Sequence, residues 1–263
     1  MLPTNSLIPL HDENPTQRTA YVTIFLIIAN ILIFFLLEPN LGQIPQCSNQ
    51  DANCQQQQLK VAGFLCKWGT VPNQVTSKPA EDPKICSLFP HRVRSSLLGL
   101  ITNVFLHGGL LHLGGNMLFL WIFGNNIEDV LGKFRYVIFY LLSGALASLT
   151  HVLGNPHADV PAIGASGAIA AVLGAYIVLF PKARVTTLIP LGFIFFTRRI
   201  PAVVVLGIWF ASQFFIGAGQ QAGGGVAWLA HVGGFVAGVV LIFVFGGWSK
   251  RPRPSFDPYR RSY

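Results

Sequence analysis

Six stretches of apolar residues, separated by polar and charged segments, run along the chain. They lie at about residues 20–37, 104–127, 134–153, 166–180, 200–217 and 226–246. Most of them approach the roughly 20 residues that an α-helix needs to cross a bilayer. This pattern predicts an all-α, polytopic membrane protein with six transmembrane helices and a long outer loop between the first two.

A further apolar run, at residues 185–197, is too short to cross a bilayer. It contains Pro190 and Gly192 and is bracketed by Arg184 and Arg198. We therefore expect this run to be interfacial or re-entrant on one side of the membrane.

Composition and charge agree with this class of protein. Hydrophobic residues make up 52% of the 263 residues and charged residues 11%, with a mean hydropathy of +0.52. Lys and Arg gather between the second and third windows, between the fourth and fifth, and after the sixth. Basic residues favour the cytoplasmic side, so both termini are expected there. Because this topology accounts for the net charge of +8, we expect no nucleic-acid-binding surface.

The loop at residues 38–103 then lies on the outer side. An even number of cysteines on the oxidising side indicates one or two disulfide bonds, with three possible connectivities. Free thiols are the alternative, and zinc is disfavoured because the sequence has no C-x-x-C pair. The CQQQQ stretch and the prolines suggest an irregular loop. All the cysteines of the chain lie here: Cys47, Cys54, Cys66 and Cys86.

A few polar side chains lie inside the apolar windows. His112 and Asn116 belong to the second window, Ser166 begins the fourth, and His231 lies in the sixth. At 1.5 Å of rise per residue, all four are about 18 to 24 Å from the inner ends of their helices. Polar side chains are costly in lipid, so these four residues, which share one depth, are candidates for a functional site. Water would have to reach that depth through a cavity.

Ser166 opens a window that would form a helix only about 22 Å long, which is shorter than the hydrocarbon slab. Its N-terminus would lie inside the membrane, with unpaired N–H groups and the positive end of the helix dipole. This setting suits a nucleophile whose own N–H helps to bind an oxyanion. The alternatives are a helix cap or close packing of small residues, and the other three residues could likewise only tie helices together.

Three motifs occur in order on the second, fourth and sixth windows. They are H-x-x-x-x-H-x-x-x-N from His107 to Asn116, G-A-S-G from Gly164 to Gly167, and A-H-x-x-G-x-x-x-G from Ala230 to Gly238. Together they resemble the rhomboid intramembrane serine proteases, over the six-helix core. The resemblance implies a rhomboid-like bundle with a Ser–His dyad and no third acidic member.

The resemblance also implies a role for each residue. Ser166 would be the nucleophile and His231 the general base that takes and returns its proton. His112 and Asn116 would stabilise the tetrahedral oxyanion together with the Ser166 N–H. Supporting, structural roles would fall to His107, Gly164, Gly167, Gly234 and Gly238.

Two positions depart from the family pattern. Leu98 and Gly99 stand where many members have a Trp-Arg pair, so the outer loop needs another anchor. Ala170 stands where many relatives have an aromatic residue that packs on the catalytic histidine. Tyr176 or Trp228 could support His231 instead.

The leading functional hypothesis is an intramembrane serine endopeptidase. It would cut transmembrane protein substrates in the lipid bilayer, in or beside a membrane-spanning helix that residues such as Gly and Ala weaken. The alternatives are a non-catalytic rhomboid-like binder that directs the trafficking of membrane proteins, and a small transporter or channel. The sequence has no zinc-protease, aspartyl-protease or nucleotide-binding motif, so we expect no cofactor, metal or nucleotide.

The sequence divides into three expected parts. These are a cytoplasmic N-terminal segment at residues 1–19, a six-helix rhomboid protease domain at 20–246, and a basic cytoplasmic tail at 247–263. The outer cysteines and the basic tail suggest a bacterial plasma membrane, with an organellar membrane as the alternative.

Overall fold

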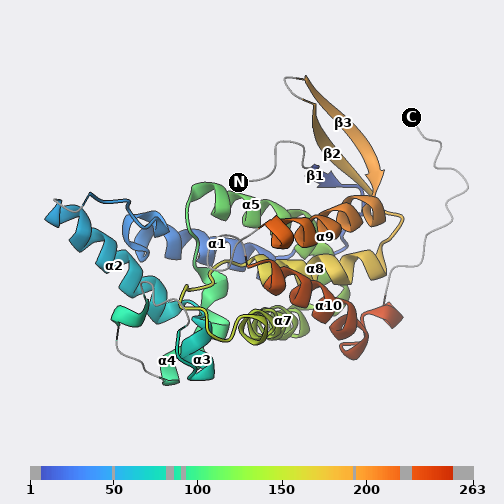
Figure 1. The fold of residues 1–263 in the computed structure, drawn as a ribbon. Coiled ribbons are helices and arrows are strands. Elements are labelled where there is room, and N and C mark those ends of the chain that lie inside the picture. Colours follow the sequence, from blue (N-terminus) through green and yellow to red (C-terminus); the bar gives the residue numbers. More distant parts are fainter. Residues whose placement is uncertain are drawn as a thin grey trace, which may run out of the picture.

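The computed structural model describes residues 7–48, 51–80, 86–89, 93–191, 194–219 and 227–250. Helices occupy all six apolar windows (Figure 1). Most of the expected tail, at 251–263, lies outside the described residues. In chain order the main helices are α1 (Tyr21–Leu36), α5 (Leu110–Phe119), α6 (Asn125–Leu131), α7 (Lys133–Gly154), α8 (Ser166–Leu179), α9 (Ala202–Gly219) and α10 (Trp228–Val244), with a π-helical turn, η4 (Leu120–Gly124), joining α5 to α6.

Helix length sets apart one element of this bundle. Within the described ranges, α7 is the helix that is long and apolar enough to cross a membrane by itself. The segments Leu97–Phe105 and Leu110–Leu131 meet the same criteria as a pair, but they bend by 86° at the break between them. The helices α1, α8, α9 and α10 are apolar but shorter.

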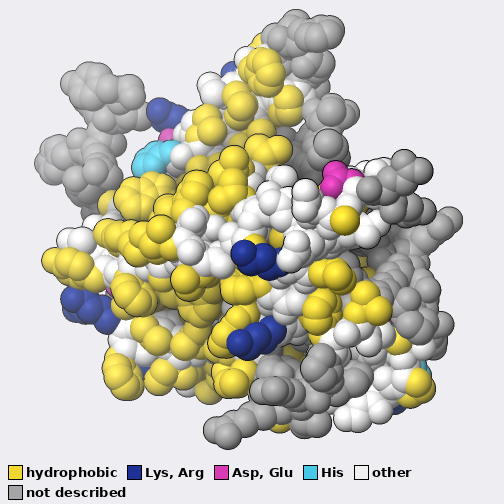
Figure 2. All heavy atoms as spheres, turned by 90° about the vertical axis from the view of Figure 1, so that its left-hand side faces the viewer, with side chains coloured by type: hydrophobic (Ala, Val, Ile, Leu, Met, Phe, Trp, Pro, Cys, Tyr) yellow, Lys and Arg dark blue, Asp and Glu magenta, His cyan; other side chains and the backbone are white. Residues whose placement is uncertain are grey.

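The surface of the bundle is rich in exposed apolar side chains, and Figure 2 shows them spread over much of one face. Leu111, Phe134 and Phe215 are at least 80% exposed. An apolar surface of this extent is unusual for a protein surrounded by water and is typical of one surrounded by lipid.

The helix α8 forms the centre of the bundle, and most of its side chains are buried. Its neighbours α7 and α10 pack closely against it because glycines leave room for the backbone. A Cβ atom added at Gly174 would collide with the carbonyl of Phe235, and one added at Gly238 would collide with the carbonyl of Ala171. The small residues of α8 and α10 therefore fix the distance between these two helices.

The outer loop is more ordered than we expected. It folds into η1 (Pro39–Gly42), α2 (Ala52–Trp68), α3 (Pro72–Thr76), η2 (Cys86–Leu88), α4 (Val93–Thr102) and η3 (Asn103–Phe105). The side chain of Asp51 accepts a hydrogen bond from the Cys54 N–H and so caps α2. The four consecutive glutamines, which we expected in an irregular loop, lie in this helix because glutamine is a good helix former. Two disulfides, Cys47–Cys54 and Cys66–Cys86, confirm the prediction of disulfide bonds and settle their connectivity.

The short apolar run before α9 folds as a β-hairpin that extends away from the helices (Figure 1). Its strands β2 (Arg184–Leu191) and β3 (Ile194–Pro201) pair antiparallel, and β1 (Ile8–Asp12) adds to the free edge of β2. Valine, isoleucine, threonine and phenylalanine dominate both strands of the hairpin, and these residues favour extended structure. The all-α expectation therefore holds for the bundle but missed this sheet.

The strand β1 also joins the sheet to the bundle. The buried carboxylate of Asp12 accepts hydrogen bonds from the Tyr176 hydroxyl at 2.7 Å and from the Asn126 amide at 2.8 Å. Burial raises the pKa of Asp12, and these hydrogen bonds oppose part of the rise. Next to it, Glu13 pairs with Arg199 of β3 at 2.9 Å.

Candidate active site

Ser166 and His231 lie in hydrogen-bond contact. The distance from Ser166 Oγ to His231 Nε2 is 2.7 Å. Ser166 is the first residue of α8, after Gly164 with its positive φ of 126°. A β-carbon is strained at that angle, so the glycine allows the chain to turn abruptly into the helix.

Close packing of α8 and α10 brings these two side chains together. His231 lies one helical turn before Gly234, whose added Cβ would collide with the carbonyl of Gly167. The serine and the histidine are thus held on facing helices at the point where the two backbones nearly touch. His231 is only 8% exposed, whereas Ser166 is partly open.

His112 lies beside the serine, on α5. A Cβ added at Gly164 would be 2.8 Å from His112 Nε2 and 3.5 Å from Ser166 Oγ, so all three groups border one small volume. The Gly108 N–H donates to His112 Nδ1 at 3.3 Å, which leaves the proton on Nε2, at the edge of the ring next to Gly164.

Asn116 follows one turn later on the same helix face. It is 8% exposed, and its Nδ2 has no hydrogen-bond partner within the described part of the chain. An amide donor of this kind is free to bind an oxygen atom brought by another molecule.

His107 lies behind His112, with the two ring centres 5.2 Å apart and the rings edge to face. It is fully buried, and its backbone N–H donates to the Glu38 carboxylate at 3.0 Å. Burial raises the pKa of Glu38 to about 7, against the opposing effect of that hydrogen bond. Glu38 lies just after the first apolar window, where the sequence gives no signal that its side chain is buried.

The ring of His231 is held by α9 rather than by the two aromatic residues we expected. Its Nδ1 lies 2.7 Å from Gln213 Oε1, and the ring of Trp209 packs at 5.9 Å between centres. Tyr176 instead bonds Asp12, and Trp228 packs against Phe214. A buried glutamine in an apolar window is the signal that could have found Gln213.

A polar network takes the place of the missing Trp-Arg pair. The side-chain Nδ2 of Asn103 lies within 3 Å of Gly99 O, Thr70 Oγ1 and Ser148 Oγ. The backbone carbonyl of Asn103 accepts a hydrogen bond from the Gly164 N–H. These bonds tie the outer loop to α7 and to the turn before Ser166. A side chain at position 99 would collide with the Gly69 carbonyl, so glycine allows this approach.

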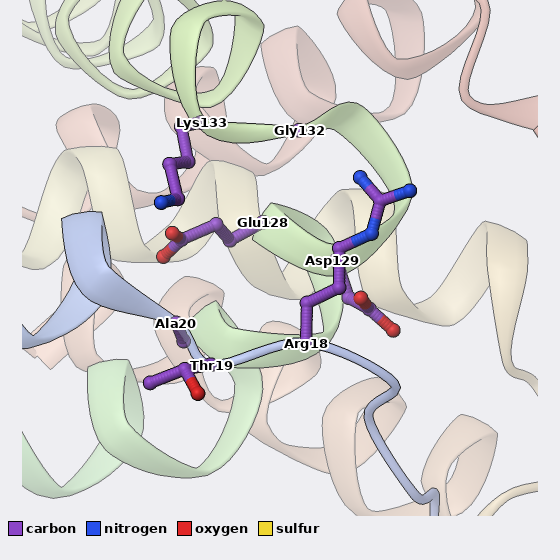
Figure 3. A pocket seen from close by; sticks show the side chains of 7 residues that line it. All are labelled: Arg18, Thr19, Ala20, Glu128, Asp129, Gly132 and Lys133. Atoms are coloured by element: carbon purple, nitrogen blue, oxygen red, sulfur yellow. The ribbon is translucent and has the colours of Figure 1, made fainter.

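Two cavities differ in their relation to these residues. One of about 20 Å³ is lined by Ser166, Asn103 and Ser148, with room for about one water molecule. A larger one of about 280 Å³ lies at the other end of the bundle, beside Glu128 and Lys133 (Figure 3). There the Glu128 carboxylate accepts the backbone N–H of Thr23 and so caps α1. Across the described ranges no group of three or more His, Cys, Asp or Glu could hold a metal ion.

The sequence of residues 94–248 matches the profile of the Rhomboid domain. The chain belongs to the rhomboid family. It is 33% identical over 155 residues to Rhomboid protein 1, mitochondrial, of Saccharomyces cerevisiae, an alignment that covers 56% of this chain and 41% of the relative. It is 32% identical over 143 residues to Rhomboid protease GluP of Bacillus subtilis, an alignment that covers 54% of this chain and 25% of the relative. It is 31% identical over 168 residues to Rhomboid-like protein 11, chloroplastic, of Arabidopsis thaliana, an alignment that covers 60% of this chain and 54% of the relative.

These relatives bear on how much of a rhomboid the chain represents and on the membrane in which it lies. The chain spans between 25% and 54% of the length of the three rhomboids. Two of the three are named as mitochondrial and chloroplastic proteins, which points away from a bacterial plasma membrane. The expectation of that location was wrong. The membrane character of the chain agrees with its family.

Proposed function

We propose that this rhomboid is an intramembrane serine endopeptidase that hydrolyses a peptide bond in or beside the transmembrane segment of a membrane protein. The observation that carries the proposal is the 2.7 Å contact between Ser166 Oγ and His231 Nε2 at the start of α8. A hydroxyl becomes an effective nucleophile when a neutral imidazole nitrogen can accept its proton.

The proposal includes a membrane arrangement. The helices α1, α5 with α6, α7, α8, α9 and α10 serve as six spans of a domain at 20–246, between a segment at 1–19 and a tail at 247–263. The 14 residues of α8 would be about 21 Å long, against a slab of about 30 Å. Ser166 would then lie below the outer membrane surface, in a recess that water must enter from the outer side.

The reaction begins when His231 Nε2 accepts the Ser166 proton and Oγ attacks the substrate carbonyl. The carbonyl oxygen becomes an oxyanion, and we assign three donors to it: the Ser166 N–H, His112 Nε2–H and Asn116 Nδ2. Preorganised donors of this kind contribute about 3 kcal/mol each in serine proteases. The imidazolium then gives its proton to the leaving amine, and the peptide bond breaks.

Water completes the cycle. With His231 again as the base, a water molecule attacks the acyl-enzyme ester, and Ser166 recovers its proton as the carboxylate product leaves. A helical substrate must first unwind, because its backbone hydrogen bonds shield each peptide bond. Substrates with glycine or other helix-weakening residues near the cleaved bond are therefore favoured.

The second candidate is a non-catalytic rhomboid that binds transmembrane helices. One relative, 31% identical over 98 residues, is named an inactive rhomboid protein. A chain of that kind needs no activated serine, so labelling of the serine separates the two candidates.

The test uses the full chain purified and reconstituted into liposomes with a model transmembrane substrate. We expect wild-type protein to cleave it and to react covalently with a fluorophosphonate, and Ser166→Ala and His231→Ala to do neither. Ser143→Ala is the matched control, since within the described residues that buried hydroxyl donates only to the carbonyl of Tyr140 in its own helix. Cleavage by Ser166→Ala at the wild-type rate would refute the assigned nucleophile.

A further inference from the structure

The strongest unassigned feature is a glutamine in the middle of an apolar helix. Gln213 of α9 is 3% exposed, although most of the neighbouring side chains of this helix are apolar. Its Nε2 donates to the Trp209 carbonyl at 3.1 Å and contacts the Ser212 hydroxyl at 3.2 Å. Its Oε1 lies 2.7 Å from His231 Nδ1. The amide is therefore held at both ends.

The donor bond to Trp209 decides which way the amide points. A carbonyl oxygen only accepts, so the NH₂ end of Gln213 belongs at the Trp209 carbonyl and the oxygen belongs at the histidine. An amide oxygen beside Nδ1 requires a proton on that nitrogen. A neutral imidazole with its proton on Nδ1 carries its lone pair on Nε2, which is the atom that faces Ser166 Oγ.

We propose that Gln213 is a positioning residue for the catalytic histidine: it fixes the tautomer of His231 with Nδ1 protonated and aims Nε2 at Ser166. This inference rests on the proposed protease function and deepens it. Gln213 would perform with an uncharged amide the orienting role that a carboxylate performs in a Ser-His-Asp triad. Among the hydrogen bonds of the described residues, the ring of His231 has only two partners, Gln213 and Ser166.

Trp209 complements this contact without replacing it. It lies four residues before Gln213, so both side chains project from one face of α9 toward the histidine. The indole ring packs at 39° to the imidazole and restricts its tilt, but it offers no acceptor to Nδ1. The tautomer is therefore the specific contribution of Gln213.

The decisive variants keep the volume of the side chain and change its chemistry. Gln213→Leu removes the acceptor, and we expect its kcat to fall by about 10- to 100-fold. This loss is smaller than the 10²- to 10⁴-fold rate increase that a positioned general base supplies, because the base itself remains. The fluorophosphonate labelling rate should fall in parallel, while KM should change little, because the substrate does not touch this residue. Gly207→Ala is the matched control on the same helix, because an added Cβ there meets no atom within 4 Å in the described structure, and it should retain both rates.

The pH profile gives a readout that a merely structural role would not move. Gln213→Glu keeps an oxygen acceptor and adds a charge that stabilises the protonated ring. The acidic limb of kcat/KM should therefore move to higher pH, with activity retained on the alkaline side. Besides residue 213, the titratable groups that act on His231 are His112 of α5 and His151 of α7, which are the same in both proteins.

The outcomes separate this inference from the function on which it rests. If wild-type protein neither cleaves nor labels, the protease proposal fails. If wild-type protein is active and Gln213→Leu keeps its kcat within about twofold, Gln213 has no positioning role. If Gln213→Leu does not fold, the glutamate variant decides, because a pH profile identical to that of wild type would overturn the inference.

Discussion

The contact between α8 and α10 predicts a large effect from one methyl group. In Gly234→Ala the new Cβ collides with the Gly167 carbonyl, and both colliding groups are fixed to backbone. Ordinary van der Waals contact begins near 3.4 Å, so the helices must move apart by on the order of 1 Å. The 2.7 Å bond between Ser166 and His231 would then exceed hydrogen-bond length.

Two magnitudes follow from this displacement. Overpacking of a close interface costs about 1–3 kcal/mol, partly offset by the roughly 1 kcal/mol that alanine gains over glycine in a helix. The effect on catalysis is larger, since a misplacement of about 1 Å can cost about 100-fold in rate. We therefore expect Gly234→Ala to fold with a modestly lower Tm and to lose about two orders of magnitude in kcat/KM.

The assay compares this variant with Gly207→Ala in liposomes, by substrate cleavage and by thermal unfolding. Gly207 lies in α9, where an added Cβ meets no atom within 4 Å in the described structure. Its alanine variant should be as active as wild type and slightly more stable. Equal activity and stability in the two variants would show that the glycine contact does not set the catalytic geometry.

Three further predictions follow from the site and its supports. If His112 and Asn116 stabilise the oxyanion as proposed, His112→Ala and Asn116→Ala should each lower kcat by about 10²-fold with little change in KM. An unchanged kcat in steady-state cleavage would count against that role. Replacing Cys66 and Cys86 by serine opens a connection across 20 residues and should destabilise the outer loop by about 3 kcal/mol, seen as a lower Tm that reductant changes less than it changes the Tm of wild type, because only Cys47–Cys54 then remains to be reduced. Glu38 has a folded pKa near 7, above its ordinary value of 4.5, so its contribution to stability is full below about pH 4.5 and is lost as the pH rises through 7. Wild type should therefore lose on the order of 3 kcal/mol more than Glu38→Gln between pH 4.5 and 8 in unfolding experiments, and parallel curves would contradict this.

The sequence predicts the helices of the bundle well, because their apolar windows are long. It could not predict the hairpin, since the run at 185–197 has the length of several kinds of element and contains both β-branched residues and Pro190. The disulfide connectivity was likewise open, because spacing alone does not select among three pairings. Both features depend on contacts between distant parts of the chain.

The candidate site shows the same division. Motifs in three windows select Ser166, His231, His112 and Asn116, and their roles stay predictions. The motifs do not select Gln213, because it lies in the fifth window and the motifs lie in the second, fourth and sixth. Glu38 escaped because a carboxylate at the end of a window is ordinarily a solvated residue. Tertiary packing, which the sequence does not display, gives these two residues their importance.

The edge strand β1 has a consequence for how this chain is assembled and handled. Asp12 meets Tyr176 across 164 positions, so β1 can take its place against α8 only after α8 has been synthesised. A deletion of residues 1–13 would remove a strand, the acceptor of the Tyr176 hydroxyl and the ionic partner of Arg199 together. The strand β1 therefore holds the C-terminal half of α8 through a contact that forms late in synthesis, and its loss would leave the Tyr176 hydroxyl without this acceptor.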